Sequence, residues 1–338
     1  MNYKKLLKKF NPFKSNRAVV LMYHRINDIR VDPWQLAVNP QNFDEQLQVL
    51  KKKYKVIQVV ELAEQIKKGR ISSNQVCITF DDGYLDNYEN AKPLLQKYNC
   101  PATFFIASHF IVSQQSYWWD ELQSIILETP ALPQNFSIAI HTETLTYNLE
   151  NNGILSEDQK QKHEKWIWPA TPPTQRAALY LALWERMKPL PLDEIVSILI
   201  SLNEIALIGS KKQSTGSSMN AVQLKDLSDE PLFKIGLHTA THPDLSSHSI
   251  EFQKNEICKN KEGLEHICDH VIDTISYPYG AHNPDTISVV SDLRLQSAFT
   301  TKASVITIKS PVYRLGRYQV LNINGEAFEK ELSRIFRK

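Results

Sequence analysis

Apolar runs alternate with segments of helical periodicity along the first third of the chain. Runs typical of buried strands occupy residues 18–22, 56–60, 76–80 and 102–107. Apolar side chains at helical spacing occupy residues 42–54, 61–68 and 85–98. Strands that alternate with helices favour a parallel sheet, because each parallel connection needs a crossover. The same alternation resumes after residue 219 and continues to a basic terminal helix at 325–338.

The alternation of strand and helix patterns is interrupted between residues 113 and 219. Residues 137–147 alternate apolar and polar side chains, which predicts a small hairpin or edge strand, and residues 174–187 and 192–205 predict helices. The composition of residues 209–218 is typical of a flexible loop. We therefore expect a basic tail at 1–17 and one folded unit at 18–338, with a largely helical insertion at about 113–219.

Three polar turns follow predicted strands. Asp81, Asp82 and Gly83 end the first, His238 and His242 follow the second, and a Pro-Tyr-Gly turn ends the third. The carboxyl ends of strands are where α/β folds bind ligands. Taken alone, the two aspartates could be turn formers, and Asp86 or Asn87 could cap the next helix. Two histidines at this spacing are more often metal ligands than structural groups.

In this order, the turns resemble the signatures of the NodB-type polysaccharide deacetylases, carbohydrate esterase family four. Residues 79–83 read T-F-D-D-G, and residues 238–242 read H-T-A-T-H. Residues 276–280 read S-Y-P-Y-G, where the family has an arginine in place of Ser276. The resemblance implies an α/β fold, a distorted (β/α) barrel of about seven strands similar to a TIM barrel.

The resemblance also implies roles for the polar residues. Asp82, His238 and His242 would hold one divalent metal, for which Zn²⁺ is the best fit, while Co²⁺, Ni²⁺ and Fe²⁺ are also suited to one oxygen and two nitrogens. Asp81 would take a proton from the water that the metal activates. The main-chain N–H of Tyr279, in the turn with Pro278 and Gly280, would stabilise the oxyanion.

Two positions depart from the commoner family pattern. A late Leu-x-His motif, which supplies the general acid there, is missing. His24 ends the first strand and resembles the acid of the circularly permuted poly-N-acetylglucosamine deacetylase branch, so we assign it that role; the alternative is a structural histidine. Arg317 or Arg314 could replace the missing arginine and orient Asp81.

These residues predict a metal-dependent hydrolase that removes N-acetyl groups from a polysaccharide, an oligosaccharide or a lipid-linked glycan. The alternatives are a sugar O-acetyl esterase or deformylase of the same fold, and a catalytically silent glycan-binding barrel. Five tryptophans of the insertion either pack its core, which is the commoner role, or stack sugars at the rim of the site; they are Trp118, Trp119, Trp166, Trp168 and Trp184.

Composition and charge limit the binding partners and the cellular location that we expect. The chain has 338 residues with a net charge of +2, which gives no general case for nucleic-acid binding. Its four cysteines show no zinc spacing and indicate reduced thiols. Without a recognisable signal peptide or membrane span, a cytoplasmic protein is expected. The basic N-terminus would allow a weak contact with the inner face of the membrane.

Overall fold

The computed structural model describes residues 16–206 and 217–337. Most of the basic tail expected at 1–17, and most of the loop expected at 209–218, lie outside the described residues. Within those two ranges, no helix is long and apolar enough to cross a membrane.

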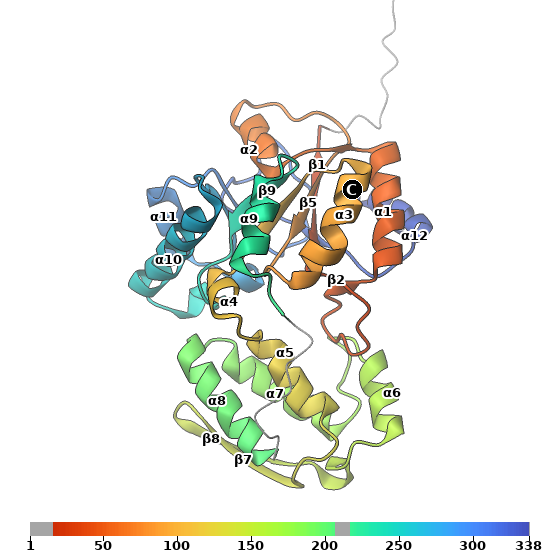
Figure 1. Ribbon diagram of the computed structural model, residues 1–338, viewed down its shortest axis with the longest axis vertical. Helices are drawn as coiled ribbons and strands as arrows, with labels where there is room; N and C mark the ends of the chain where they lie inside the picture. The colour runs from red at the N-terminus through yellow and green to blue at the C-terminus, as the bar shows by residue number, and fades with distance from the viewer. Residues whose placement is uncertain (1–15, 207–216, 338) are drawn as a thin grey trace, which may run out of the picture.

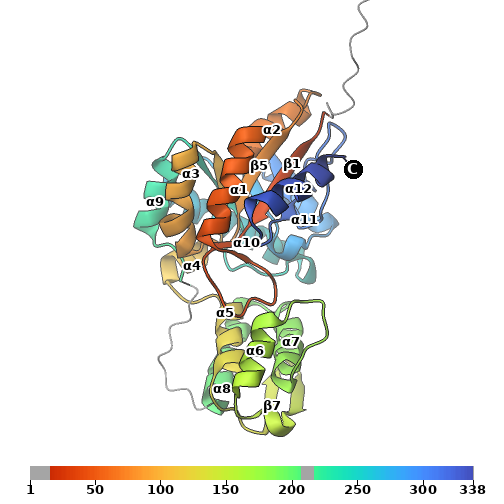
Figure 2. The same cartoon turned by 90° about the vertical axis from the view of Figure 1, so that its right-hand side faces the viewer.

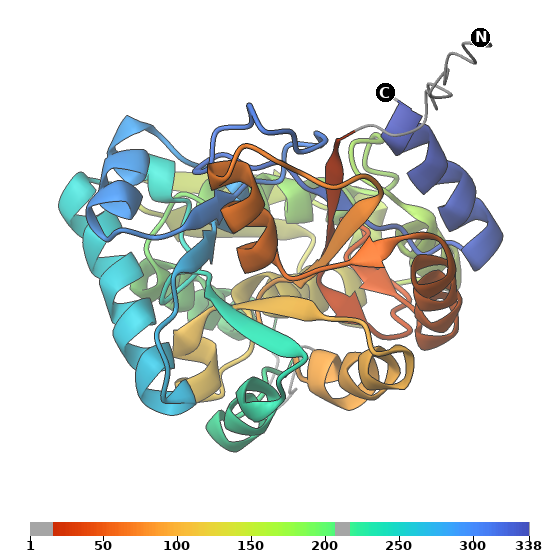
Figure 3. The same cartoon turned by 90° about the horizontal axis from the view of Figure 1, so that it is seen from above.

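A curved parallel sheet forms the centre of the molecule (Figure 3). Its seven-strand path runs in the order β11 (Ser297–Phe299), β10 (Thr274–Ser276), β9 (Phe233–Leu237), β6 (Ala102–Ile106), β5 (Gln75–Phe80), β1 (Ala18–Tyr23) and β12 (Tyr318–Gln319). A short β4 (Lys55–Val56) also pairs with β5. The segment that leads into β12 reaches back to β11, because the Leu315 N–H donates to the Ala298 carbonyl at 2.9 Å. The predicted α/β barrel of about seven strands is confirmed.

Helices cover the outer face of the sheet (Figures 1 and 3). They are α1 (Pro40–Lys53), α3 (Lys92–Tyr98), α4 (Ser108–Ser113), α9 (Ala221–Asp229), α10 (Ile250–Cys268), α11 (Pro284–Asp292) and α12 (Gly325–Arg337). Helix α2 (Val59–Lys67) instead packs its apolar side chains with those that point into the barrel. The strand predicted at 56–60 is therefore too long, since Val59 already belongs to α2.

Side chains along each strand alternate between two apolar cores. In β1, Val19 and Leu21 pack against the outer helices, whereas Ala18 and Val20 pack inside the barrel. This alternation follows from the period of two in an extended chain. Both faces of the sheet are covered, which explains why the strands read as continuous apolar runs in the sequence.

A second group of elements lies below the sheet in Figures 1 and 2, and we call residues 118–206 the helical lobe. It contains α5 (Trp118–Gln123), α6 (Glu157–Lys165), α7 (Gln175–Met187), α8 (Leu192–Ile205) and an antiparallel hairpin of β7 (Asn135–Ile140) and β8 (Glu143–Asn148). The lobe has its own apolar core, in which Trp118, Leu122 and Leu183 are buried. The helices and the hairpin predicted here are present.

Candidate active site

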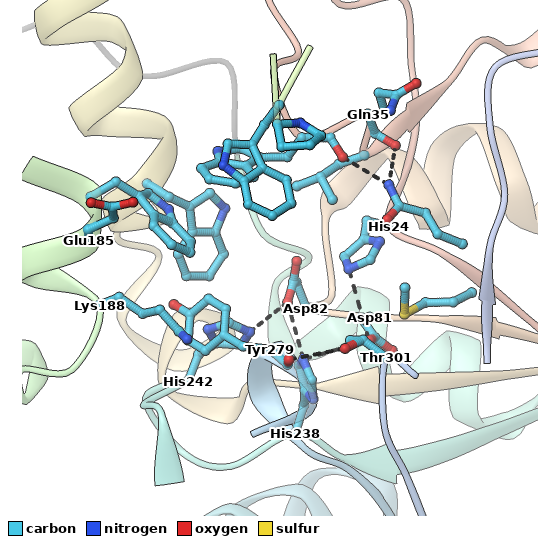
Figure 4. A pocket seen from close by; sticks show the side chains of 18 of the residues that line it. His24, Gln35, Asp81, Asp82, Glu185, Lys188, His238, His242, Tyr279 and Thr301 are labelled. Carbon is cyan, nitrogen blue, oxygen red and sulfur yellow. Dashed lines mark hydrogen bonds and ion pairs between the residues drawn. The ribbon is translucent and has the colours of Figure 1, made fainter. Parts of the chain in front are cut away.

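Strand alternation carries three polar side chains to one mouth of the barrel. The inward-facing series of β1 continues beyond the strand to His24, that of β5 to Asp81, and that of β9 to His238. Because all these strands are parallel, their carboxyl ends meet at the same place. Figure 4 shows the three side chains converging there.

Asp82, His238 and His242 form a buried cluster with the ligand types of a divalent metal site. Their nearest donor atoms all lie within 4.8 Å of one another. The Oδ1 atom of Asp82 lies 3.4 Å from Nε2 of His238 and 3.3 Å from Nε2 of His242. Asp82 and His242 both have left-handed backbone conformations, with φ of 74° and 62°. Such conformations cost about 1–3 kcal/mol each and persist where the surroundings impose them.

The hydrogen bonds around this cluster leave ligand atoms available for a metal ion. Oδ1 of Asp82 is buried and has no hydrogen-bond partner among the described residues. The Nδ1–H of His238 donates to the Ser276 carbonyl at 2.7 Å, which leaves its Nε2 lone pair directed at the cluster. Burial lowers the pKa of His242 to about 3, so its imidazole is neutral and able to coordinate. The residues present therefore suit the group that the family resemblance implies.

Arg317, in the segment before β12, makes a bidentate contact with the carboxylate of Asp81. Its Nη1 donates to Oδ1 at 2.7 Å and its Nη2 donates to Oδ2 at 2.6 Å, while Nη2 also donates to the Ser276 hydroxyl at 2.6 Å. Of the two arginines suggested by the sequence, Arg317 thus makes the contact, and Arg314 is exposed. Ser276, where the sequence lacks the arginine of the family motif, therefore lies directly against the Arg317 guanidinium.

The charge on Asp81 is stabilised by its neighbours. Burial alone would raise its pKa, but Arg317 and the nearby histidines hold the pKa well below its usual range. Burial would also raise the pKa of Asp82, but His238 and His242 outweigh this effect, so the pKa of Asp82 is lowered. Both carboxylates are therefore ionised at neutral pH.

His24 lies beside Asp81, with Nε2 4.0 Å from Oδ2 of that carboxylate and 14% of its side chain exposed. Its main chain is held by the start of the helical segment that follows β5, because the Asn87 amide donates to the His24 carbonyl at 2.7 Å. Asp86 accepts from the Ile26 N–H at 3.0 Å and from Nε of Arg25 at 3.1 Å. Asp86 and Asn87, considered as helix caps from the sequence, instead anchor the end of β1.

The turn of Pro278, Tyr279 and Gly280 borders the same site. Tyr279 has a φ of 57°, and its carbonyl accepts from the Thr301 hydroxyl at 3.1 Å. Gly280 also has a positive φ, and a Cβ there would meet Thr301 at 2.4 Å. The Tyr279 ring lies 4.7 Å from that of His242, so the turn is packed directly against the cluster of Asp82, His238 and His242.

The converging residues occupy one end of a pocket of about 650 Å³ that both parts of the molecule line. Its helical-lobe side includes Trp119, Trp168, Trp184, Glu185 and Lys188. Figure 4 places Glu185 far from His24, with Asp82 between them. Lys188 donates to Asp244, two residues after His242, at 2.9 Å, so an ion pair ties the lobe to the loop that carries a candidate ligand.

The five tryptophans of the insertion differ in how deeply they are buried and in whether they line the pocket. Trp118, Trp119 and Trp166 are buried in the lobe, as expected for core packing, although Trp119 also lies 4.7 Å from the His242 ring. Trp168 and Trp184 line the pocket, and the buried Trp119 does so as well. Sequence reasoning missed Trp34, Glu185 and Lys188, which line the pocket too. Trp34 precedes the very short β3 (Ala37–Val38) and carried no periodic signal.

Known proteins share this architecture. The deacetylase PplD of Streptococcus pyogenes, solved in complex with acetate, matches 95% of this chain and 98% of its own with a TM-score of 0.58 and 18% identity. IcaB from Ammonifex degensii matches 96% of this chain and 99% of its own with a TM-score of 0.57 and 17% identity. At these identities the likeness shows a shared fold.

Sequence comparison gives more specific relatives. The poly-beta-1,6-N-acetyl-D-glucosamine N-deacetylase of Staphylococcus aureus is 28% identical over 164 residues, which are 44% of this chain and 54% of that protein. The chain spans about half the length of the curated relatives it matches. The family model described as polysaccharide deacetylase matches residues 68–166 and 205–298. Since these stretches make up more than half of its length, the chain belongs to the polysaccharide deacetylase family.

Proposed function

We propose that this chain is a hydrolase that removes N-acetyl groups from a β-linked N-acetylglucosamine glycan. One observation supports the proposal most strongly: an arginine-held carboxylate, a histidine and an Asp-His-His cluster share one pocket. The S. aureus relative acts, by its name, on a β-1,6-linked polymer of this sugar. The fold relative from S. pyogenes was solved with acetate, which is the product that such a reaction releases.

Asp82, His238 and His242 would hold the metal, and zinc suits their donor set of one oxygen and two nitrogens. When bound, a divalent cation supplies Lewis acidity, which polarises a carbonyl and lowers the pKa of water. Asp81 then accepts the proton of the attacking water on a carboxylate oxygen. Because the pKa of Asp81 is held low, its carboxylate is ionised at neutral pH and has an oxygen able to take up a proton, although it is a weak base. Arg317 fixes the direction of that carboxylate.

His24 is the proton donor for the departing nitrogen in this proposal. An amide nitrogen leaves readily only after protonation, and His24 is the remaining imidazole at the pocket mouth that the metal set does not use. Its Nε2 lies on the Asp81 side of the site, 4.0 Å from the carboxylate. The Tyr279 N–H would donate to the oxyanion from the opposite wall, where the left-handed turn presents the main chain.

Acetate release from β-1,6-linked N-acetylglucosamine oligomers tests the proposal. The purified chain is assayed as isolated, after dialysis against a chelator, and after addition of Zn²⁺, Co²⁺, Ni²⁺ or Fe²⁺. We expect release that chelation abolishes and that Zn²⁺ restores. Equal release before and after complete metal removal would contradict the metal role. Release from O-acetylated sugars alone would favour an esterase of the same fold.

A further inference from the structure

Four aromatic rings form a continuous row along one side of the pocket, and we call Trp168, Trp34, Trp184 and Tyr279 the aromatic wall. Ring centroids are 5.6 Å apart between Trp168 and Trp34, 4.4 Å between Trp34 and Trp184, and 5.9 Å between Trp184 and Tyr279. The row ends 4.7 Å from the ring of His242. It therefore leads from the outer rim of the pocket to the candidate metal cluster.

Hydrogen bonds fix the outer part of this wall. The main-chain N–H of Trp168 donates to the Pro33 carbonyl at 2.9 Å, and this bond joins a loop of the helical lobe to a loop of the barrel. The Trp34 indole N–H donates to the Tyr180 hydroxyl at 2.8 Å. The Gln319 amide donates to the Trp34 carbonyl at 2.9 Å. The indole of Trp34 is thus held by a hydrogen bond of its own, and the main chains of Trp34 and Trp168 are tied to segments distant in the sequence. A ligand would therefore lose little free energy in ordering the central ring of the wall.

The outermost ring of the wall, that of Trp168, is far more exposed than the buried tryptophans of the same lobe. Trp168 is 48% exposed, whereas Trp118 and Trp166 of the same lobe are 2% and 4% exposed. Removing large apolar surface from water is favourable at about 25 cal/mol per Å², so an indole left open beside a pocket is available to a ligand. The electron-rich face of an indole matches the slightly positive C–H groups on the face of a pyranose.

Polar groups accompany these rings. Glu185 directly follows Trp184, is exposed and lines the pocket, and Gln35 directly follows Trp34 and lines it too. Figure 4 shows Glu185 at the end of the pocket away from His24 and Asp81. A few polar side chains beside an apolar face are what a sugar-binding site needs, because hydroxyl groups ring the edge of a pyranose.

We propose that the aromatic wall is a second sugar subsite, which binds the residue next to the one that loses its acetyl group. This inference rests on the proposed function and extends it: the substrate is an oligomer of at least two N-acetylglucosamine units. Trp34 and the lobe residues Trp168 and Trp184 all lie outside the stretches that the family model matches, 68–166 and 205–298. The three indoles of the subsite therefore come from parts of this chain that the family pattern does not include, whereas Tyr279 lies within the second matched stretch.

The test compares chain lengths in two independent assays. Acetate release gives kcat and KM for N-acetylglucosamine and its β-1,6-linked dimer, trimer and tetramer with the zinc-loaded protein. Isothermal titration calorimetry with the same sugars and the chelator-treated protein measures binding without turnover. The variants are Trp168→Ala, Trp168→Tyr and, as a matched control, Ile167→Ala, since Ile167 is 44% exposed and does not line the pocket. Thermal unfolding of each variant checks the fold.

We expect KM and Kd to fall from the monomer to the longer oligomers. Trp168→Ala should raise both by about three- to tenfold for the trimer and by a smaller factor for the monomer, because one stacking contact is worth about 0.5–1.5 kcal/mol. Trp168→Tyr should restore most of the affinity, and Ile167→Ala should match the wild type.

Each other outcome has a defined meaning. Acetate release that is equally efficient in Trp168→Ala and in the wild type at every chain length would overturn the subsite and leave the proposed function standing. Length-dependent, Trp168-dependent binding without acetate release would retain the subsite and reject the deacetylase. Loss of monomer turnover in Trp168→Ala with a lowered unfolding temperature would show that the indole only packs the two parts together, and the absence of both binding and release would reject both ideas.

Discussion

Arg317 and Asp81 form a buried bidentate ion pair across the barrel mouth, with two N–O distances of 2.7 and 2.6 Å. The Arg317 side chain is fully buried, so this contact is shielded from solvent. Pairs of this geometry fix the plane of the carboxylate as well as its charge. The pair therefore determines which way the candidate base faces.

Replacing this arginine should impair turnover more than substrate binding. Arg317→Lys keeps the charge but loses the second hydrogen bond, so we expect kcat for acetate release to fall on the order of 10–100-fold, with a smaller change in KM. Arg314→Lys is the matched control, since Arg314 is exposed on the same segment. Wild-type kcat in Arg317→Lys at unchanged stability would show that Asp81 needs no such orientation.

A second prediction concerns His24 as the proton donor. His24→Ala should lower kcat for the amide substrate by about 10²–10⁴-fold. It should lower the rate with p-nitrophenyl acetate much less, because nitrophenolate leaves without protonation. Steady-state rates on both substrates make the comparison. Equal losses on the amide and the activated ester would assign His24 a structural role.

The hydrogen bond from Asn87 to the His24 carbonyl should position that histidine. Asn87→Ala should lower kcat on the order of tenfold, since small displacements of a reacting group are costly. Asn90→Ala is a close control, because Asn90 makes the equivalent 2.8 Å bond to the carbonyl of Ile26. Both variants lose a part-buried hydrogen bond to a main-chain carbonyl, and Asn87→Ala also loses a 3.1 Å bond to Oδ1 of Asp86, so its unfolding temperature should fall at least as far as that of Asn90→Ala. A similar fall in kcat for both would mean that Asn87 acts only through stability.

His163 of the helical lobe should make stability depend on pH. Its pKa is lowered from 6.5 because it is buried, and its ring nitrogens lie 3.1 Å from the Leu127 carbonyl and 2.7 Å from the Thr174 hydroxyl. Below pH 6.5 the unfolded chain binds a proton that the folded chain resists, so the unfolding free energy falls as the pH drops through this window. Above pH 6.5 the contribution of His163 is fully present.

Thermal unfolding between pH 8 and pH 5 measures this effect. The wild type should lose more stability over this range than His163→Gln, which has no imidazole to protonate. His141→Gln is the control, since the His141 side chain is 60% exposed. The same pH dependence in wild type and His163→Gln would show that protonation of other groups governs the acid destabilisation.

The fold and the family could be predicted because their signals are local. Asp81 and Asp82 are adjacent, and His238 and His242 are four residues apart, so one strand end delivers each pair. The metal role of the cluster remains a proposal, although the three side chains do meet. Short-range patterns also located the hairpin of β7 and β8.

Contacts between distant segments could not be predicted in the same way. Arg317 lies 236 residues from Asp81, and only the pairing of β12 beside β1 brings it to the site. The choice between Arg317 and Arg314 therefore had to come from the structure. Trp34 was missed for the same reason, since its partners Trp168 and Trp184 belong to another lobe. Val59 was placed in a strand because a β-branched run fits both a strand and a buried helix start.

The most direct test of the central claim is acetate release from a β-1,6-linked N-acetylglucosamine trimer by zinc-loaded wild type and Asp81→Asn, with zinc content measured in both. Asn keeps the shape of the side chain but cannot accept the proton. The account predicts release by the wild type and a loss of at least about 10²-fold in Asp81→Asn at equal zinc content. Undiminished release by Asp81→Asn, or none from the zinc-loaded wild type, would contradict it.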